Sequence, residues 1–209
     1  MGIITAIEAQ KKRGSRRSIF VDGEFVAGVH EDVVLALGLA VGQVFDKERL
    51  AELLKAETKR KARESAIRLI NYRDRSVSEI RRRLIGDDFP EEIVEEVTDQ
   101  LSRAGLLNDE KFSRDWIKAR SASKPMGKTR LAWELRSRGV DASTVDQALE
   151  ELDEKTEYDL ALSAAARKLR KMDCADPLTK NRLSSFLRRR GFDWDTISRV
   201  IDELCPWNP

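Results

Sequence analysis

The sequence predicts a mostly α-helical fold, with three tandem three-helix repeats in an elongated arc, preceded by a small N-terminal module that contains a β-hairpin. Charged residues make up 36% of the 209-residue chain, well above the usual quarter, which suits long helices with solvated faces. A pattern of apolar residues recurs three times at almost equal spacing, whereas strand-like alternation is confined to the first part of the chain. We expect four parts, at residues 1–55, 56–107, 108–154 and 155–209.

The N-terminal part, residues 1–55, is predicted to form a small three-stranded sheet followed by helices. The stretches IITAIEAQ and SIFVDGEFVAGV alternate apolar and polar residues, and Asp22-Gly23 between two apolar runs is a strong hairpin signal. A short helix is expected from about His30 to Leu37, and a second from Asp46 onward that can run on into the first repeat. His30, directly before EDVV, is interpreted as a surface or capping residue.

Three segments of equal length align without a gap: SEIRRRLIGDDFPEEIVEEVTDQL (78–101), TRLAWELRSRGVDASTVDQALEEL (129–152) and NRLSSFLRRRGFDWDTISRVIDEL (181–204). Apolar residues four apart, such as Ile80 and Leu84, put a stripe on one face of a helix, so each segment carries two amphipathic helices. The aligned apolar positions, which we expect to hold the fold, are Ile80, Leu131 and Leu183; Leu84, Leu135 and Leu187; Phe89, Val140 and Phe192; Val94, Val145 and Ile197; and Leu101, Leu152 and Leu204.

Another helical stretch precedes each pair, near residues 57–73, 109–120 and 156–172, which makes three helices per repeat. The second helix of each repeat has a start signal, at Ser76 (with Glu79 completing a capping box), at Gly127 and at Thr179.

The turn between the second and third helices also follows a pattern. In repeats 2 and 3 a glycine stands where a helix end needs a left-handed residue, and an aspartate follows as the cap of the next helix. These residues are Gly139 with Asp141 and Gly191 with Asp193. In repeat 1, Asp88 and Pro90 take these positions, so we expect a different turn there.

The charge of each repeat is basic first and acidic last, although the net charge of the chain is only +2. Residues 59–83 carry ten basic and three acidic side chains, and 87–99 carry seven acidic and no basic ones. Residues 111–138 have nine basic against two acidic, and 141–154 have six acidic and no basic. Residues 167–190 have nine basic against two acidic, and 193–203 have four acidic against Arg199 alone.

If the repeats pack with similar orientation, their basic helices present one continuous positive track that suits phosphate without reading base sequence. The alternative is that acidic and basic helices neutralise one another inside each repeat and are merely solvated.

The inventory of reactive residues does not point to an enzyme. One histidine excludes multi-histidine metal sites, and we expect no metal and no cofactor. Cys174 and Cys205 are too few for a disulfide framework and are expected to be reduced thiols. No run of 18 apolar residues and no secretory signal is present, so we expect a cytoplasmic protein without membrane contact.

One short motif and three tryptophans need separate interpretation. Residues 122–129 (ASKPMGKT) fit a relaxed phosphate-loop pattern, but the preceding stretch is helical and charged, so ATP binding is set aside. Trp116 lies on an apolar helical face and is assigned to the core. For Trp133 and Trp194, surface recognition and packing between repeats remain equal alternatives.

The stretches YRDRSVSEIRRRL (72–84), AGLLNDEKFSRDWIKAR (104–120) and GKTRLAWELRSRGVD (127–141) resemble sequence features of RecX regulatory proteins. The resemblance is clearest in repeats 1 and 2, looser in repeat 3, and covers essentially all of residues 1–205. It implies a non-enzymatic modular protein that lies in the groove of the RecA–DNA filament. Such proteins mainly inhibit the ATPase and strand exchange of RecA and limit filament growth, in DNA repair, recombination and control of the SOS response.

We therefore expect the partner to be the RecA nucleoprotein filament, with direct contact to single- or double-stranded DNA as a further expectation, and a monomeric chain. The alternatives are a stand-alone, sequence-tolerant DNA-binding protein of helical type and a protein-interaction scaffold without a link to nucleic acid. The basic side chains expected at the RecA- and DNA-binding surface are Arg73, Arg75, Arg81, Arg82, Arg83, Lys118, Arg120, Lys124, Lys128, Arg130, Arg136, Arg138, Lys180, Arg182, Arg188, Arg189 and Arg190.

Overall fold

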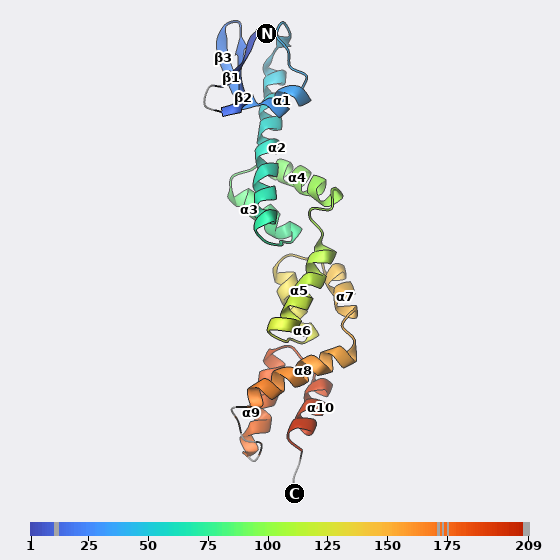
Figure 1. Cartoon of the computed structure of the whole chain (residues 1–209). Coiled ribbons are helices and arrows are strands. Elements are labelled where there is room, and N and C mark those ends of the chain that lie inside the picture. The colour runs from blue at the N-terminus through green and yellow to red at the C-terminus, as the bar shows by residue number, and fades with distance from the viewer. Residues whose placement is uncertain (11–12, 171, 173, 175, 207–209) are drawn as a thin grey trace. The chain divides into compact units, whose positions relative to one another are not determined.

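The structure, a computed structural model, describes residues 1–10, 13–170, 172, 174 and 176–206 (Figure 1). These residues form four strands and ten helices, so the predicted mostly helical class with three three-helix repeats is confirmed. The chain divides into two compact units, one of residues 1–73 with 80–104, the other of residues 74–79 with the chain from Gly105 onward. The division into four parts at the predicted boundaries and the elongated arc both stay predictions.

The N-terminal module is an antiparallel sheet with the strand order β3-β2-β1-β4. Its strands are β1 (Gly2–Gln10), β2 (Arg13–Val21), β3 (Glu24–His30) and β4 (Val44–Phe45). The predicted hairpin at Asp22 and Gly23 is confirmed, because both residues have positive φ, 50° and 86°, as the tight turn requires. The predicted number of strands, three, was too low by one. Strand β4 was missed because its two residues are too few to show an alternation of apolar and polar side chains.

Two helices complete the module. Helix α1 (Glu31–Ala36) begins at His30, whose Nδ1 accepts a hydrogen bond from the backbone N–H of Asp32, so the predicted capping role is confirmed. Helix α2 (Lys47–Tyr72) is capped by Asp46 and runs on into repeat 1, as expected. A buried core of both sheet and helix residues, including Ile4, Ile19 and Leu53, holds the module together.

Glu57 fastens α2 to the sheet. Its carboxylate accepts hydrogen bonds from the backbone N–H of His30 at 3.0 Å and from Arg16 at 2.8 Å, and Arg60 lies 3.4 Å away. Burial alone raises the pKa of Glu57, but the hydrogen bonds from His30, Arg60 and Arg16 outweigh it, so the pKa lies below its ordinary value. The surroundings of this buried carboxylate therefore favour its ionised form, and both of its oxygens accept hydrogen bonds.

Repeat 1 consists of the end of α2 with α3 (Val77–Gly86) and α4 (Glu91–Arg103). The capping box at its second helix is confirmed, since Ser76 and Glu79 exchange hydrogen bonds with each other's backbone N–H. The predicted difference in its turn is also confirmed. Asp88 takes the left-handed conformation with φ 62°, and Pro90 precedes α4 without a side-chain cap.

Repeats 2 and 3 have the same arrangement of three helices. Repeat 2 contains α5 (Asp109–Ser123), α6 (Lys128–Ser137) and α7 (Ala142–Glu150); repeat 3 contains α8 (Glu154–Leu169), α9 (Pro177–Arg189) and α10 (Trp194–Leu204). Each has its own buried core built on the aligned leucines of its second helix, which are fully buried: Leu131 and Leu135 in repeat 2, Leu183 and Leu187 in repeat 3. Of the aligned apolar set, only Phe89 and Leu204 are half-buried. The glycine turns are confirmed, with φ 80° at Gly139 and 82° at Gly191.

The predicted start of the second helix in repeat 3 at Thr179 was wrong. Helix α9 begins at Pro177, with Asp176 as its cap accepting a hydrogen bond from the N–H of Leu178 at 2.9 Å. An aspartate before a proline is the stronger signal, because proline is preorganised for the first helical position and leaves no N–H unsatisfied there.

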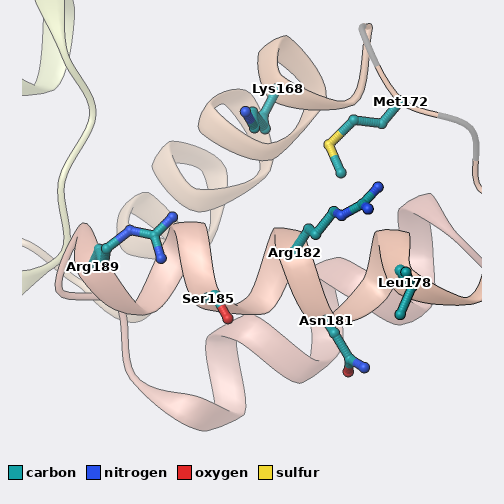
Figure 2. Close-up of a pocket in the computed structure, with 7 residues that line it drawn as sticks. All are labelled: Lys168, Met172, Leu178, Asn181, Arg182, Ser185 and Arg189. Carbon is teal, nitrogen blue, oxygen red and sulfur yellow. The ribbon is translucent and has the colours of Figure 1, made fainter.

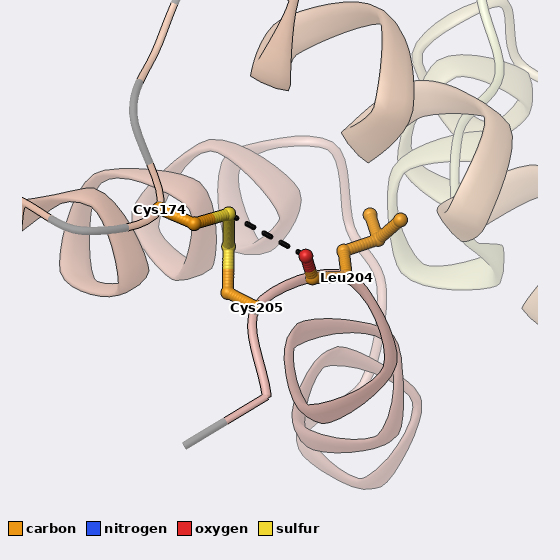
Figure 3. The surroundings of a disulfide bond; sticks show 3 residues. All are labelled: Cys174, Leu204 and Cys205. Carbon is orange, nitrogen blue, oxygen red and sulfur yellow. Dashed lines mark hydrogen bonds between the residues drawn. A yellow bond between two sulfur atoms is a disulfide. The ribbon is translucent and has the colours of Figure 1, made fainter. Parts of the chain in front are cut away.

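The expectation of two reduced thiols was also wrong for this structure. Cys174, in the connection between α8 and α9, and Cys205, at the end of α10, form a disulfide across 31 residues (Figure 3). The bond closes a loop that contains both α9 and α10. Sequence spacing gave no sign of it, because the two Cα atoms come within 5.5 Å only through the packing of repeat 3.

Candidate interaction surface in the helical repeats

Within the second unit, the start of α3 meets repeat 2 through backbone contacts. The hydroxyl of Ser76 donates to the carbonyl of Arg138 at 2.7 Å, and the N–H of Val77 donates to Asp109 at 2.9 Å. A Cβ atom on Gly139 would lie 2.2 Å from the side chain of Ser78, so the glycine permits this close approach. Residues 76–79, Asp109 and the Gly139 turn form junction A.

The same arrangement recurs between repeats 2 and 3. The N–H of Gly127 donates to the carbonyl of Arg190 at 2.9 Å, and the N–H of Lys128 donates to Glu157 at 3.0 Å. A Cβ on Gly191 would lie 2.3 Å from the backbone nitrogen of Arg130. Residues 124–130, Glu157 and the Gly191 turn form junction B, which repeats junction A with equivalent residues.

The side chains at junction A neutralise one another. Arg138 forms an ion pair with Glu79 at 2.7 Å and lies 3.8 Å from the centroid of the Trp116 ring. Glu134 is buried and accepts hydrogen bonds from Arg120 at 2.8 Å and from the indole N–H of Trp116 at 3.1 Å. Every cation here has a carboxylate partner, and the indole fills the space between them. Trp116 packs against the core of repeat 2, as predicted.

The side chains at junction B do not neutralise one another. A hollow of about 310 Å³ there is lined by Ala164, Phe186 and the cations Lys124, Arg167, Lys168 and Arg190. Among the residues that the structure describes, no carboxylate lies within salt-bridge distance of these four cations. Burial, followed by repulsion from Arg167, lowers the pKa of Arg190. Junction B is therefore a concentration of uncompensated positive charge.

Two further hollows extend this positive region. One shares Lys124, Phe186 and Arg190 with the first and adds Met126, Arg130 and Arg189. The other lies between α9 and the end of α8, where Figure 2 shows Arg182 and Met172 reaching toward each other and Lys168 projecting from α8. Cations from repeats 2 and 3 thus border one region, here called the junction B surface: Lys124, Arg130, Arg167, Lys168, Arg182, Arg189 and Arg190.

The predicted binding residues fall into groups with different surroundings. Several are engaged in ion pairs inside the chain, at N–O distances from 2.7 to 3.8 Å: Arg81 with Asp99, Arg83 with Asp87, Arg120 and Arg130 with Glu134, Arg136 with Asp146, Arg138 with Glu79, and Arg182 with Asp176. Others have no such partner within the described part of the chain: Lys118, Lys124, Lys128, Lys180, Arg188, Arg189 and Arg190. Arg73 and Arg82 are exposed and Arg75 is half-buried.

The basic track is therefore uneven. In repeat 1 the acidic helix α4 pairs with the basic α2 and α3, through Lys55 with Glu92, Lys59 with Glu96 at 2.6 Å, and Arg81 with Asp99 at 3.2 Å. In repeat 2, α7 similarly offers Asp146 and Glu151 to Arg136 and Arg114. For these two repeats the alternative of internal neutralisation holds in part, whereas most described cations of repeat 3 have no ion pair within the described residues, Arg182 with Asp176 being the exception.

The remaining sequence motifs fit the helical design. The phosphate-loop pattern at residues 122–129 follows a helix, and the N–H of Gly127 is already bonded to Arg190, so it offers no phosphate cradle. Trp133 and Trp194 are exposed, at 57% and 66%, so neither ring is buried between the repeats of the second unit; the Arg130 guanidinium lies 4.2 Å from the Trp133 ring centroid. Across the described residues, no cluster of metal-ligating side chains occurs, and no helix is long and apolar enough to cross a membrane.

The sequence reasoning did not single out Arg167, Lys168 and Phe186. The signal was present, because the gapless alignment of the repeats places Phe186 where repeat 2 has Glu134. A charged residue replaced by an aromatic one in an otherwise regular repeat marks a position where the local chemistry changes.

Comparison with known families covers the four parts of the chain in order. Residues 2–46 match the regulatory protein RecX N-terminal domain, and residues 62–101, 108–149 and 155–201 match the first, second and third three-helix domains of RecX. The chain belongs to the RecX family. A regulatory protein RecX of Clostridioides difficile is 31% identical, over 98% of this chain and 96% of its own length. One of Corynebacterium efficiens is 39% identical, over 78% of this chain and 80% of its own length.

Solved RecX structures agree with this fold. A crystal structure of regulatory protein RecX aligns with a TM-score of 0.82 at 25% identity, covering 97% of this chain and 100% of that one. RecX from Lactobacillus salivarius aligns with a TM-score of 0.64 at 21% identity, covering 71% of this chain and 97% of its own, which supports the fold alone.

Proposed function

We propose that this chain modulates RecA recombinase, mainly by inhibition, by binding in the groove of the RecA–DNA filament, reducing ATP hydrolysis and strand exchange and limiting filament growth. Its place would be in DNA repair, recombination and SOS control, as a monomer in the cytoplasm. The observation that carries the proposal is RecX-family membership across all four parts of the chain. The junction B surface supports it, because five of its seven cations, all except Arg130 and Arg182, have no carboxylate partner among the described residues, and such cations favour a negatively charged polymer or an acidic protein surface.

No catalytic role is proposed for any residue. A tandem array of small repeats offers a long surface and many weak contacts in place of one deep pocket, which suits binding along a filament. The cations that have no carboxylate partner among the described residues, such as Lys124, Arg188 and Arg189, are the first candidates for contact with acidic groups of RecA or DNA phosphates.

ATP hydrolysis by RecA on single-stranded DNA tests the proposal directly. We expect the rate to fall as the chain is added at substoichiometric amounts relative to RecA, because a filament modulator acts on many subunits at once. Unchanged hydrolysis at all ratios would remove the RecA assignment.

The second candidate is a stand-alone, sequence-tolerant DNA-binding protein. The unpaired cations of α9 and the exposed Trp133 favour it, since such groups bind phosphate and stack on bases. It predicts tight duplex binding without RecA that weakens steeply as salt is raised. The proposed RecA modulator instead predicts much tighter association when RecA is present.

A further inference from the structure

Junctions A and B share the same backbone arrangement but differ in four of the side chains around it. The bond from Val77 to Asp109 in junction A and the bond from Lys128 to Glu157 in junction B fix the register of α5 against α8. In this register Trp116 corresponds to Ala164, and Arg120 corresponds to Lys168. On the next helix, Glu134 corresponds to Phe186. Junction B thus lacks both the indole and the carboxylate that complete junction A.

A second carboxylate is missing as well. Arg138 of junction A pairs with Glu79 at 2.7 Å, whereas the residue aligned with Glu79 in junction B is Arg130. Arg190, the residue of junction B that corresponds to Arg138, donates to the carbonyl of Pro125 at 2.9 Å, and its guanidinium lies 4.8 Å from the Phe186 ring centroid. Junction B therefore has a cation, Arg130, in place of Glu79 and an aromatic ring, Phe186, in place of Glu134, beside a hollow where junction A has a tryptophan.

From this comparison we infer that the junction B surface is a docking site for an acidic segment of a protein partner, one that brings a carboxylate together with an apolar side chain. The carboxylate would meet Lys124, Lys168 and Arg190, as Glu134 meets Arg120 in repeat 2. The apolar side chain would occupy the hollow over Ala164 and Phe186 that Trp116 fills in repeat 2. The occupant would thus supply the carboxylate and the apolar side chain that junction A has and junction B lacks.

The observations favour a protein over a nucleic acid. The internal precedent for filling this space is a pair of amino-acid side chains, Trp116 and Glu134. The Phe186 ring has the Arg190 guanidinium at 4.8 Å and the Lys168 ammonium at 5.8 Å, so cations border the hollow beside the ring, and a carboxylate that pairs with them fits there better than a stacked base. That the partner is the RecA filament rests on the proposed function; that the site takes an acidic peptide does not.

The test measures binding of short fluorescein-labelled peptides to the full chain by fluorescence anisotropy, without RecA. The probe has a Glu-Glu-Trp-Glu core, and its control has Gln in place of each Glu. We expect the Glu peptide to bind at least about tenfold more tightly, which corresponds to ~1.4 kcal/mol. Equal binding of the two peptides would overturn the inference.

Two variants locate the binding. Phe186→Glu restores the carboxylate of repeat 2 and should weaken binding of the Glu peptide at least about tenfold. Lys168→Glu changes an exposed side chain and should have a similar effect, so the test does not depend on one substitution being tolerated. Tyr72→Glu is the matched control, because it adds the same charge at a residue that is 83% exposed in the other unit.

Each outcome of the peptide-binding test either supports or contradicts the proposed site. Loss of binding in Phe186→Glu and Lys168→Glu but not in Tyr72→Glu supports the site. Equal loss in all three variants would show a nonspecific charge effect and contradict it. Tighter binding of labelled oligo-dT than of the Glu peptide, lost in the same two variants, would assign the surface to nucleic acid and overturn the inference. Because RecA is absent, none of these results depends on the ATPase assay.

Discussion

At the scale of single residues, two buried glutamates bind neighbouring elements through their carboxylates, but their surroundings shift the two pKa values in opposite directions. Glu57 is surrounded by donors from Arg16, Arg60 and His30, which hold its pKa below the ordinary value. Glu157 accepts one hydrogen bond, from the N–H of Lys128, and burial together with the nearby Asp193 raises its pKa. The surroundings of Glu57 stabilise the carboxylate anion, whereas those of Glu157 disfavour it, although its oxygen still accepts the hydrogen bond that closes junction B.

Glu157→Gln should therefore raise the midpoint of thermal unfolding at neutral pH. The amide oxygen can still accept from Lys128, and the burial cost of the charge disappears. Because the folded pKa of Glu157 is raised, its favourable contribution is present below the unfolded pKa and is lost as pH rises through the folded pKa. The advantage of the variant should thus shrink as the pH falls toward 4.5, the ordinary value for glutamate.

Glu57→Gln is the opposite control, measured by circular dichroism over the same pH range. Its lowered folded pKa means that the contribution of the carboxylate is present above the unfolded pKa and is lost as pH falls through the folded value. This variant should be destabilised at neutral pH. A lower unfolding midpoint for Glu157→Gln at neutral pH would contradict the account of junction B.

At the scale of elements, each junction depends on a glycine turn pressed against the first turn of a neighbouring helix. Gly139 and Gly191 combine a left-handed backbone with close approach to Ser78 and to Arg130. Either property alone would favour glycine, and the two together exclude any other residue without a shift of the backbone.

Gly191→Ala should cost about 2–4 kcal/mol of unfolding free energy, because the new methyl group adds a backbone clash to the strain of positive φ. Gly105→Ala is the matched control. Gly105 also has positive φ, 71°, but a Cβ there would have no atom within 4 Å, so only about 1 kcal/mol is expected. Urea unfolding of both variants gives the comparison, and an equal loss would show that the contact at junction B is not formed.

The helices, turns and caps were predictable to the extent that they depend on residues close together in the sequence. The repeat alignment predicted the cores, the glycine turns and the caps at Asp141 and Asp193, because these follow from periodicity and local hydrogen bonding within a few residues. The two-residue strand β4 and the disulfide between Cys174 and Cys205 escaped prediction, since both depend on which distant residues meet. The start at Thr179 was a weaker local signal preferred over Asp176-Pro177.

The sequence predicted only part of the candidate surface, because the rest also depends on which distant residues meet. Composition located the basic helices, but whether an arginine is free depends on tertiary partners. Arg138 aligns with Arg190, yet Arg138 is paired with Glu79 while Arg190 has no carboxylate partner within the described residues. Comparing equivalent positions between repeats is what separates the two.

At the scale of the whole molecule, a net charge of +2 conceals an uneven distribution. Repeats 1 and 2 pair much of their positive charge with their own acidic helices, whereas in the described part of repeat 3 only Arg182, with Asp176, is seen in an ion pair. Exposed ion pairs contribute little to stability but cancel the local field, so the attraction for a negatively charged partner should come mainly from repeat 3. Long-range attraction of this kind weakens as salt is raised.

Sedimentation is the most direct test of the proposed binding of this chain to the RecA–DNA filament. The chain is mixed with RecA filaments assembled on single-stranded DNA with a slowly hydrolysed ATP analogue, or with the same DNA alone, at low and at physiological salt. We predict that it pellets with the filament at both salt concentrations, and at physiological salt only when RecA is present. A chain that stays in the supernatant with filaments at low salt, or that pellets equally with bare DNA, would contradict the account.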